Sequence, residues 1–135
     1  MKKILFSTVL GLGIVWASPL SKGKNLFQNN CASCHGIKAQ GKIGPALNGT
    51  GHSAHHSPMS MMQKIKKGGK IMPSFKGKLK DEEIMYILKY LKSTWPKNVQ
   101  KHYNKKFGNG MMGKGMKGMK HMDMKMGEHM HKHKD

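Results

Sequence analysis

Apolar residues recur at helical spacing in three stretches of this 135-residue chain, which predicts three helices. The clearest pattern lies within residues 81–94, where Asp81, Glu82 and Glu83 place negative charge at the N-terminus of the predicted helix. Asp81 is a suitable N-cap for this helix. The apolar stripe that follows consists of Ile84, Ile87, Leu88, Leu91 and Trp95.

The other two predicted helices are shorter. Ser21 is the expected N-cap of the first, and Gly23 and Phe27 lie four positions apart on one of its faces. The second begins after Ser57, with proline at its first position, and ends at two glycines, residues 68–69. Its inward residues are expected to be Met61, Met62 and Ile65. The length leaves room for one small domain, so we predict an all-α fold of three to four helices.

The two ends of the chain differ from the middle. Lys2 and Lys3 precede an apolar run at residues 4–16, and Ala17 follows as a small-residue cleavage site, as in a secretory signal. From residue 108 onward, methionine, histidine, glycine and lysine predominate, which is typical of a disordered chain. We therefore predict a cleaved signal peptide (1–17), a folded domain (18–97), a flexible extension (98–135) and a periplasmic location.

The charge balance narrows the class of partner. All 25 basic residues are lysine, against six carboxylates, and the net charge is +19 with histidine neutral. Such an excess indicates nucleic acid, an anionic membrane surface or an acidic protein as partner. An exported protein seldom meets nucleic acid, and the chain carries no nucleic-acid-binding motif. Acidic proteins and anionic membrane surfaces are therefore the expected partners.

The motif Cys31-Ala32-Ser33-Cys34-His35 carries the strongest chemical signal, because this spacing is the attachment sequence for a c-type haem. Each thiol can add across one vinyl group on the same edge of the macrocycle, which leaves His35 under the iron as the proximal ligand. A thioredoxin-type redox pair would require a βαβ context, and a zinc site two further ligands at metal spacing. Neither is found, so we predict one covalent haem held by Cys31 and Cys34.

The second axial position of the iron has several candidate ligands. A thioether suits an electron carrier because it stabilises Fe(II) and raises the reduction potential. Met72 lies in a predicted loop beside Pro73, which makes it the preferred candidate. The other methionines of the domain lie in predicted helices, where core packing is the default role: Met59, Met61, Met62 and Met85. Three loop histidines are the alternative ligands: His52, His55 and His56.

Residues 20–96 resemble the class I cytochromes c. The resemblance rests on residues 23–27 before the haem motif, on Gly-Pro-Ala-Leu at 44–47, on Met-Pro-Ser-Phe at 72–75 and on the last predicted helix. It implies a small cytochrome c domain around a covalent haem, with Met72 as the distal ligand of the iron. It also implies that the carbonyl of Pro45 accepts a hydrogen bond from His35 and that Leu47 lies against the haem face.

The resemblance further implies that the first and last helices cross. The crossing would place Gly23 and Phe27 against Tyr86 or Tyr90. Lys80 departs from the family, which often has a serine or threonine cap at this position, so the first turn of the last helix would depend on Asp81.

These features predict a periplasmic carrier of single electrons between respiratory-chain partners. The expected partners are acidic faces of membrane-bound respiratory complexes, to which lysines would steer the protein. No acid/base constellation accompanies the haem motif, so we predict that the protein is not an enzyme. A haem-based sensor with an open iron position is one alternative.

A second alternative is a metal-handling protein whose extension binds copper. Thioethers are soft ligands that select Cu(I), while imidazole suits Cu(II). The candidate copper ligands are Met116, Met119, His121, Met122, Met124, Met126, His129, His131 and His133. A solvated cationic tail without a metal is the competing interpretation.

Overall fold

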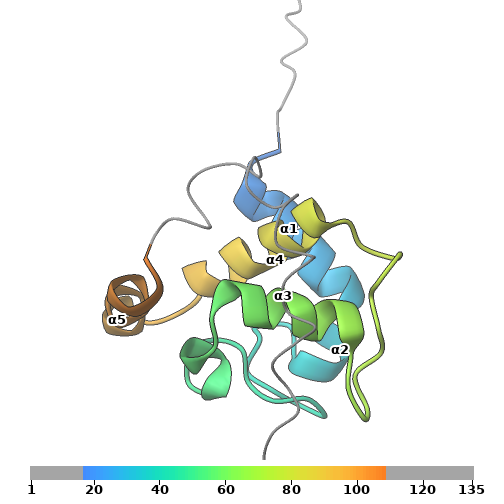
Figure 1. The fold of residues 1–135 in the computed structure, drawn as a ribbon, viewed down its shortest axis with the longest axis horizontal. Coiled ribbons are helices and arrows are strands. Elements are labelled where there is room, and N and C mark those ends of the chain that lie inside the picture. The colour runs from blue at the N-terminus through green and yellow to red at the C-terminus, as the bar shows by residue number, and fades with distance from the viewer. Residues whose placement is uncertain (1–16, 109–135) are drawn as a thin grey trace, which may run out of the picture.

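The structure is a computed structural model, and it describes residues 17–108. These residues form five α-helices and one short 3-10 helix joined by loops (Figure 1). In chain order the elements are α1 (Pro19–Asn30), α2 (Ala32–His35), η1 (His52–His55), α3 (Pro58–Lys67), α4 (Asp81–Ser93) and α5 (Lys97–Phe107). The all-α prediction is therefore confirmed. Across residues 17–108, no helix is long and apolar enough to cross a bilayer.

Helices α1 and α4 approach each other closely where they cross. A methyl group on Gly23 would lie 2.6 Å from the carbonyl carbon of Tyr86 and would overlap its oxygen. One turn further along α1, the ring of Phe27 packs on Tyr90 with ring centroids 5.6 Å apart. The predicted crossing is confirmed, with Tyr86 and Tyr90 both at the contact.

Serine side chains begin α1 and α3. The hydroxyl of Ser18 accepts a hydrogen bond of 3.2 Å from the backbone N–H of Ser21. The prediction of Ser21 as the cap was wrong, because the helix begins three residues earlier and Ser21 supplies the donor. The α3 prediction is confirmed: Ser57 caps the helix, and Gly68 ends it with φ +75°.

A carboxylate from the third position of α4 closes its first turn. The backbone N–H of Lys80 donates to the Glu83 carboxylate at 2.8 Å. The prediction of Asp81 as the cap was wrong, because its carboxylate points to α3 and pairs with Lys66 at 3.0 Å. Both partners of that ion pair are partly exposed, so it adds at most about 1 kcal/mol of stability.

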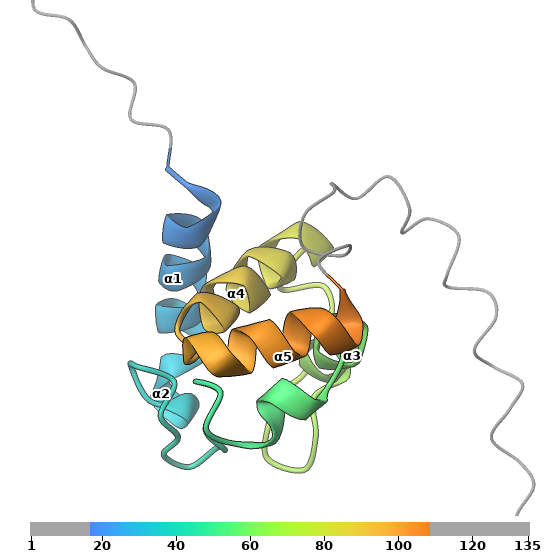
Figure 2. The ribbon, with the colours of Figure 1, turned by 90° about the vertical axis from the view of Figure 1, so that its left-hand side faces the viewer.

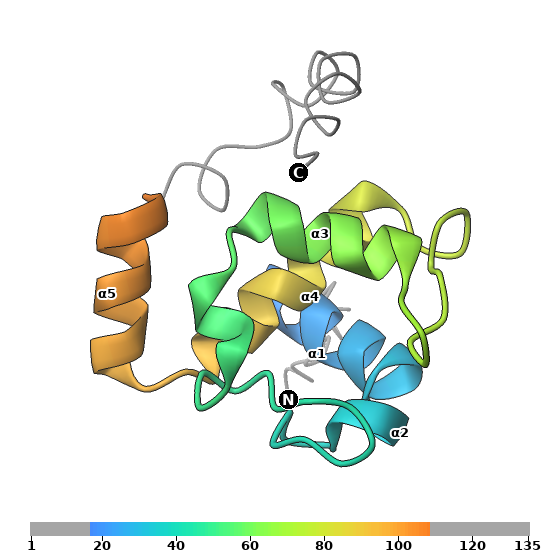
Figure 3. The same ribbon diagram turned by 60° about the horizontal axis from the view of Figure 1, so that its bottom comes forward.

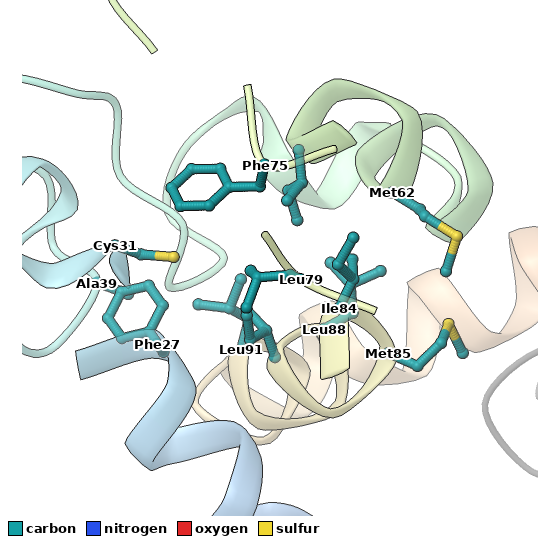
Figure 4. Packing of buried hydrophobic residues seen from close by; sticks show 12 residues of the cluster. Phe27, Cys31, Ala39, Met62, Phe75, Leu79, Ile84, Met85, Leu88 and Leu91 are labelled. Atoms are coloured by element: carbon teal, nitrogen blue, oxygen red, sulfur yellow. The ribbon is translucent and has the colours of Figure 1, made fainter. Parts of the chain in front are cut away.

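The hydrophobic core lies between α1, α3 and α4 (Figure 4). The predicted stripe of α4 faces it throughout, from Ile84 to Leu91, and Trp95 just beyond the helix is 3% exposed. Cys31 lies at the edge of this cluster, opposite Phe75 from the loop between α3 and α4. The core therefore borders the haem motif directly.

Helix α5 packs on the domain, beyond the boundary that composition predicts at residue 97. Tyr103 is 1% exposed and meets the ring of Trp95 edge-on, with centroids 4.9 Å apart. The side-chain amide of Gln100 donates to the Trp95 carbonyl at 2.8 Å. The first residues of the predicted extension therefore belong to a helix that packs on the domain through a buried aromatic side chain. The signal peptide prediction and the rest of the extension fall on residues 1–16 and 109–135, outside the described residues.

Candidate haem-binding site

The cysteine motif continues the first helix into a second short one. The backbone N–H of Cys31 donates to Phe27 in α1 at 2.8 Å, and the N–H of His35 donates to Cys31 at 2.9 Å. Both cysteines line one cavity. The turn of α2 therefore presents two thiols and an imidazole to the same space.

The electrostatics of this pair differ from those of a redox dithiol. Burial, with a smaller contribution from Cys34, raises the pKa of the Cys31 thiol to about 11. Redox-active Cys-x-x-Cys pairs have lowered thiol pKa values because their thiolate must attack a disulfide. The direction of the shift argues against the thioredoxin-type alternative.

The imidazole of His35 is held by the loop that follows α2. Its Nδ1 lies 2.8 Å from the carbonyl oxygen of Pro45, which accepts the Nδ1–H hydrogen and leaves Nε2 free to bind a metal. The same loop is tied to the motif through its backbone, because Gly41 N–H donates to His35 and Gly44 N–H donates to Cys34, each at 2.8 Å. The loop of residues 41–45 therefore fixes the orientation of the His35 ring.

Gly44 has a role that the sequence interpretation missed. A methyl group at this position would lie 2.8 Å from Cε1 and 2.9 Å from Nδ1 of His35. Only glycine lets the loop lie flat against the ring. The sequence signal was the Gly-Pro pair itself, which identifies a turn but does not show which side chain the turn approaches.

One cavity of about 740 Å³ brings the predicted site residues together. This volume falls in the usual range for cofactor sites. Its walls include every predicted haem-site residue: Cys31, Cys34, His35, Pro45, Leu47 and Met72. Ile65 from α3 and Leu88 from α4 add apolar wall, and none of the lining residues is acidic. The cavity therefore combines two thiols, a free imidazole nitrogen and a thioether in an apolar space.

The alternative distal ligands separate in the structure. His52 and His56 line the same cavity as Met72. His55 instead lines a second hollow of about 460 Å³ between η1 and α5, on the other side of the 3-10 turn. The place of His55 on η1 thus argues against it as a ligand, and His52 and His56 stay alternatives to Met72.

The loop that carries Met72 is hydrogen-bonded to the end of α3. The N–H of Gly69 donates to the Met72 carbonyl at 2.8 Å, and the N–H of Phe75 donates to Ile65 at 3.1 Å. A methyl group on Gly68 would lie 2.6 Å from that Met72 carbonyl oxygen, so the close approach requires glycine. Fixing the backbone on both sides of Met72 limits the positions that its thioether can reach.

The donor set and the cavity fit a covalently attached haem. Two thiols can bond to the vinyl groups of this cofactor, an oriented imidazole and a thioether can ligate its iron, and the apolar walls suit its ring. Within residues 17–108, no group of three or more His, Cys, Asp or Glu side chains could hold a metal ion by itself. The candidate copper ligands fall on residues 116–133, outside the described part of the chain.

Comparison with known proteins agrees with this chemistry. A family model described as "Cytochrome C oxidase, cbb3-type, subunit III" matches residues 18–91. A cytochrome c-553-like protein from Synechocystis sp. is 38% identical over 73 residues, which are 53% of this chain and 66% of the relative. Cytochrome c6 from Anabaena variabilis is 36% identical over 72 residues, which are 51% of this chain and 84% of the relative.

A solved structure shares the fold. Cytochrome CL from the methylotrophic bacterium Methylophaga aminisulfidivorans superposes with a TM-score of 0.51 and 28% sequence identity, covering 57% of this chain and 53% of that chain. Helix α5 lies beyond the residues that the family model matches. Because that match covers more than half of the chain and coincides with the cavity and its thiol pair, the chain belongs to the c-type cytochromes, in the cbb3-type oxidase subunit III family.

Proposed function

We propose that this protein is a monohaem carrier of single electrons. The observation that carries the proposal is the single cavity that joins the thiol pair, the oriented imidazole of His35 and the thioether of Met72. The described residues hold one Cys-x-x-Cys-His motif, so one haem is expected. Bound haem supplies one-electron exchange between Fe(III) and Fe(II).

The chain's part in this function is to keep the surroundings of the iron constant. His35 would hold one axial position, with its ring fixed by the Pro45 carbonyl, and Met72 would hold the other. The backbone bonds on either side of Met72 restrain the distal loop. When both axial ligands stay in place in both oxidation states, little reorganisation accompanies electron transfer. This property suits a carrier better than a sensor, which needs an open or exchangeable position.

Replacing Met72 with leucine tests the distal ligand. We expect Met72→Leu to remove the weak long-wavelength sulfur-to-iron band from the ferric absorption spectrum and to lower the reduction potential, because the thioether favours Fe(II). Leucine has a similar volume, so packing changes little.

Met61→Leu is the matched control, because Met61 lines the same cavity from α3. It should keep the band. A wild-type protein without the band would contradict Met72 ligation and transfer the role to His52, His56 or an open position.

We also propose acidic redox partners, in particular membrane-bound respiratory complexes in an exported compartment. Residues 17–108 hold seventeen lysines and three carboxylates. Each carboxylate already has an internal partner: Asp81 pairs with Lys66, Glu82 with the Tyr86 hydroxyl and Glu83 with the Lys80 backbone. Most of the lysine charge is therefore available to a partner. The apolar run at residues 4–16 supports export.

Added salt should slow electron transfer if lysines steer the encounter. With membranes from the source organism as electron acceptor, we expect the second-order rate constant to fall about tenfold or more as ionic strength rises. Lys64 and Lys70, both exposed on the cavity wall, are the lysines closest to this exchange surface.

A Lys64→Gln/Lys70→Gln variant should therefore lose more of the salt dependence than Lys97→Gln/Lys101→Gln on α5. A rate that does not change with salt would contradict steering.

A further inference from the structure

Helix α5 carries positive charge without an acidic residue to balance it. Its eleven residues include four lysines and no carboxylate. The three carboxylates of residues 17–108 lie together at positions 81–83, in the first turn of α4, where each has an internal partner. Element η1, which contacts α5, has no carboxylate either. No lysine of α5 therefore forms an ion pair within residues 17–108.

Three of these lysines form one exposed row along the helix. Lys97, Lys101 and Lys105 follow one another at intervals of four, so they share a face, and all three are exposed. Like charges at this spacing repel one another and destabilise a helix. The opposite face is anchored by Tyr103, which is 1% exposed and packs on Trp95. Tertiary packing thus holds the row together, and an anionic surface would relieve its repulsion.

The hollow between η1 and α5 widens this row into a larger cationic area. The hollow measures about 460 Å³, and its polar wall includes His55 from η1 and His102 and Lys106 from α5. None of the residues of this wall is acidic. Imidazole and ammonium N–H groups can donate to phosphate oxygens. Figure 2 shows α5 lying along the surface of the domain with η1 beside it. We call the whole area the α5 face: His55, Lys97, Lys101, His102, Lys105 and Lys106.

The α5 face lies apart from the haem motif. Figures 1 and 3 show α5 at one side of the domain and α2, which carries Cys34 and His35, at the other. No residue of α5 lines the haem cavity, whereas Lys64 and Lys70 do. The helix also lies beyond residues 18–91, which the family model matches. A surface bound at the α5 face would therefore leave the cavity wall at Lys64 and Lys70 open to a redox partner.

We propose that the α5 face is a docking surface for a membrane that contains anionic phospholipids. Lysines near such a membrane bind it through charge alone and need no apolar anchor. The hollow beside the lysine row offers donors to a headgroup phosphate. Residues 109–135, which follow α5 directly in the sequence, add six lysines against three carboxylates. The positive charge that an anionic membrane attracts therefore continues along the chain from α5.

The composition of the α5 face fits lipid headgroups better than a protein partner. The core of a protein interface is apolar, with aromatic residues and arginine enriched and lysine depleted. The aromatic side chains of α5 are not available for such a core, because Tyr103 and Phe107 pack on each other with ring centroids 4.8 Å apart. The large exposed apolar side chains of residues 17–108 all lie on other elements: Leu20, Ile37, Ile43 and Ile71.

The test uses the haem-loaded full chain and protein-free vesicles. The wild-type protein should co-sediment with vesicles of phosphatidylglycerol and phosphatidylcholine in equal parts, and not with phosphatidylcholine alone. Each lysine near an anionic surface strengthens binding about fivefold, so we expect Lys97→Gln/Lys101→Gln to weaken it about 25-fold. Lys97→Arg/Lys101→Arg keeps both charges and should bind as the wild type does.

Lys64→Gln/Lys70→Gln is the matched control, because it removes the same charge from the wall of the haem cavity. It should weaken vesicle binding by less than about threefold, since charges beyond a Debye length from the membrane contribute little. This order of the two variants is the reverse of the order expected for the salt dependence of electron transfer. A failure here is therefore distinguishable from a failure of the proposed function, on which the α5 face does not depend.

Two outcomes would overturn the proposal. A wild-type protein that does not bind the anionic vesicles would assign the α5 face to an acidic protein instead. Equal losses in the two glutamine variants would show that net charge, and not the α5 face, determines membrane binding.

Discussion

A Cys31→Ala/Cys34→Ala variant is expected to lose covalent haem and, with it, most of its helical structure. The haem cavity of about 740 Å³ adjoins the core of a domain whose described part spans residues 17–108. Unfilled cavity volume destabilises a protein by about 24 cal/mol per Å³. Even if only a third of this open cavity behaves in that way, the penalty is about 6 kcal/mol, comparable to the whole stability of a small domain, about 5–15 kcal/mol.

The measurement is far-UV circular dichroism of the purified variant beside a haem stain of the denatured protein. Ser33→Ala is the matched control, because Ser33 is an exposed residue of the same motif and of the same cavity wall. It should retain both haem and helix content. Native-like helix content in the haem-free cysteine variant would show that the polypeptide core is sufficient and would contradict the prediction.

Gly23→Ala is expected to destabilise the haem-loaded protein by about 3 kcal/mol, as overpacking of a rigid contact does. Helix propensity alone predicts the opposite sign, since alanine in a helix interior is favoured over glycine by about 1 kcal/mol. The packing effect should be the larger because the new methyl group would overlap the Tyr86 carbonyl, a backbone group that cannot rotate away. α1 and α4 would have to separate, which would also loosen the contact between Phe27 and Tyr90.

Chemical denaturation followed by circular dichroism measures this change in the free energy of unfolding. Gly77→Ala is the control, because Gly77 has φ +79° but no atom within 4 Å of an added methyl group. It should lose only the about 1 kcal/mol that a left-handed conformation costs a residue with a side chain. If Gly23→Ala were no more destabilising than Gly77→Ala, the close crossing of α1 and α4 would not be a source of stability.

Sequence reasoning worked best where chemistry depends on neighbouring residues. The spacing of Cys31, Cys34 and His35 indicates haem attachment without any knowledge of the fold, because one helical turn determines the geometry. The stripe from Ile84 to Leu91 likewise predicts the buried face of α4 from its period alone. The stripe prediction agrees with the structure for this local reason, and the three residues of the haem motif line one cavity.

It worked less well where several side chains competed for one local role. Ser18 and Ser21 are both suitable helix caps, and only the backbone shows that the helix begins at Pro19. The same holds for α4, where Glu83 reaches back to the Lys80 N–H and Asp81 pairs with Lys66 on another helix. The partner on α3 is fifteen positions away in the chain, so no local pattern indicates it.

The sequence by itself determined the cofactor chemistry, the three core helices and the set of candidate ligands, because spacing and period express these locally. Only the tertiary structure decided that His52 and His55, three positions apart, line different cavities and that Gly44 lies against His35. It also showed that α5 packs on Trp95. These outcomes depend on where the loop after His35 runs. That course is set by distant hydrogen bonds, such as the one between Trp95 and the Leu47 carbonyl, 48 positions apart.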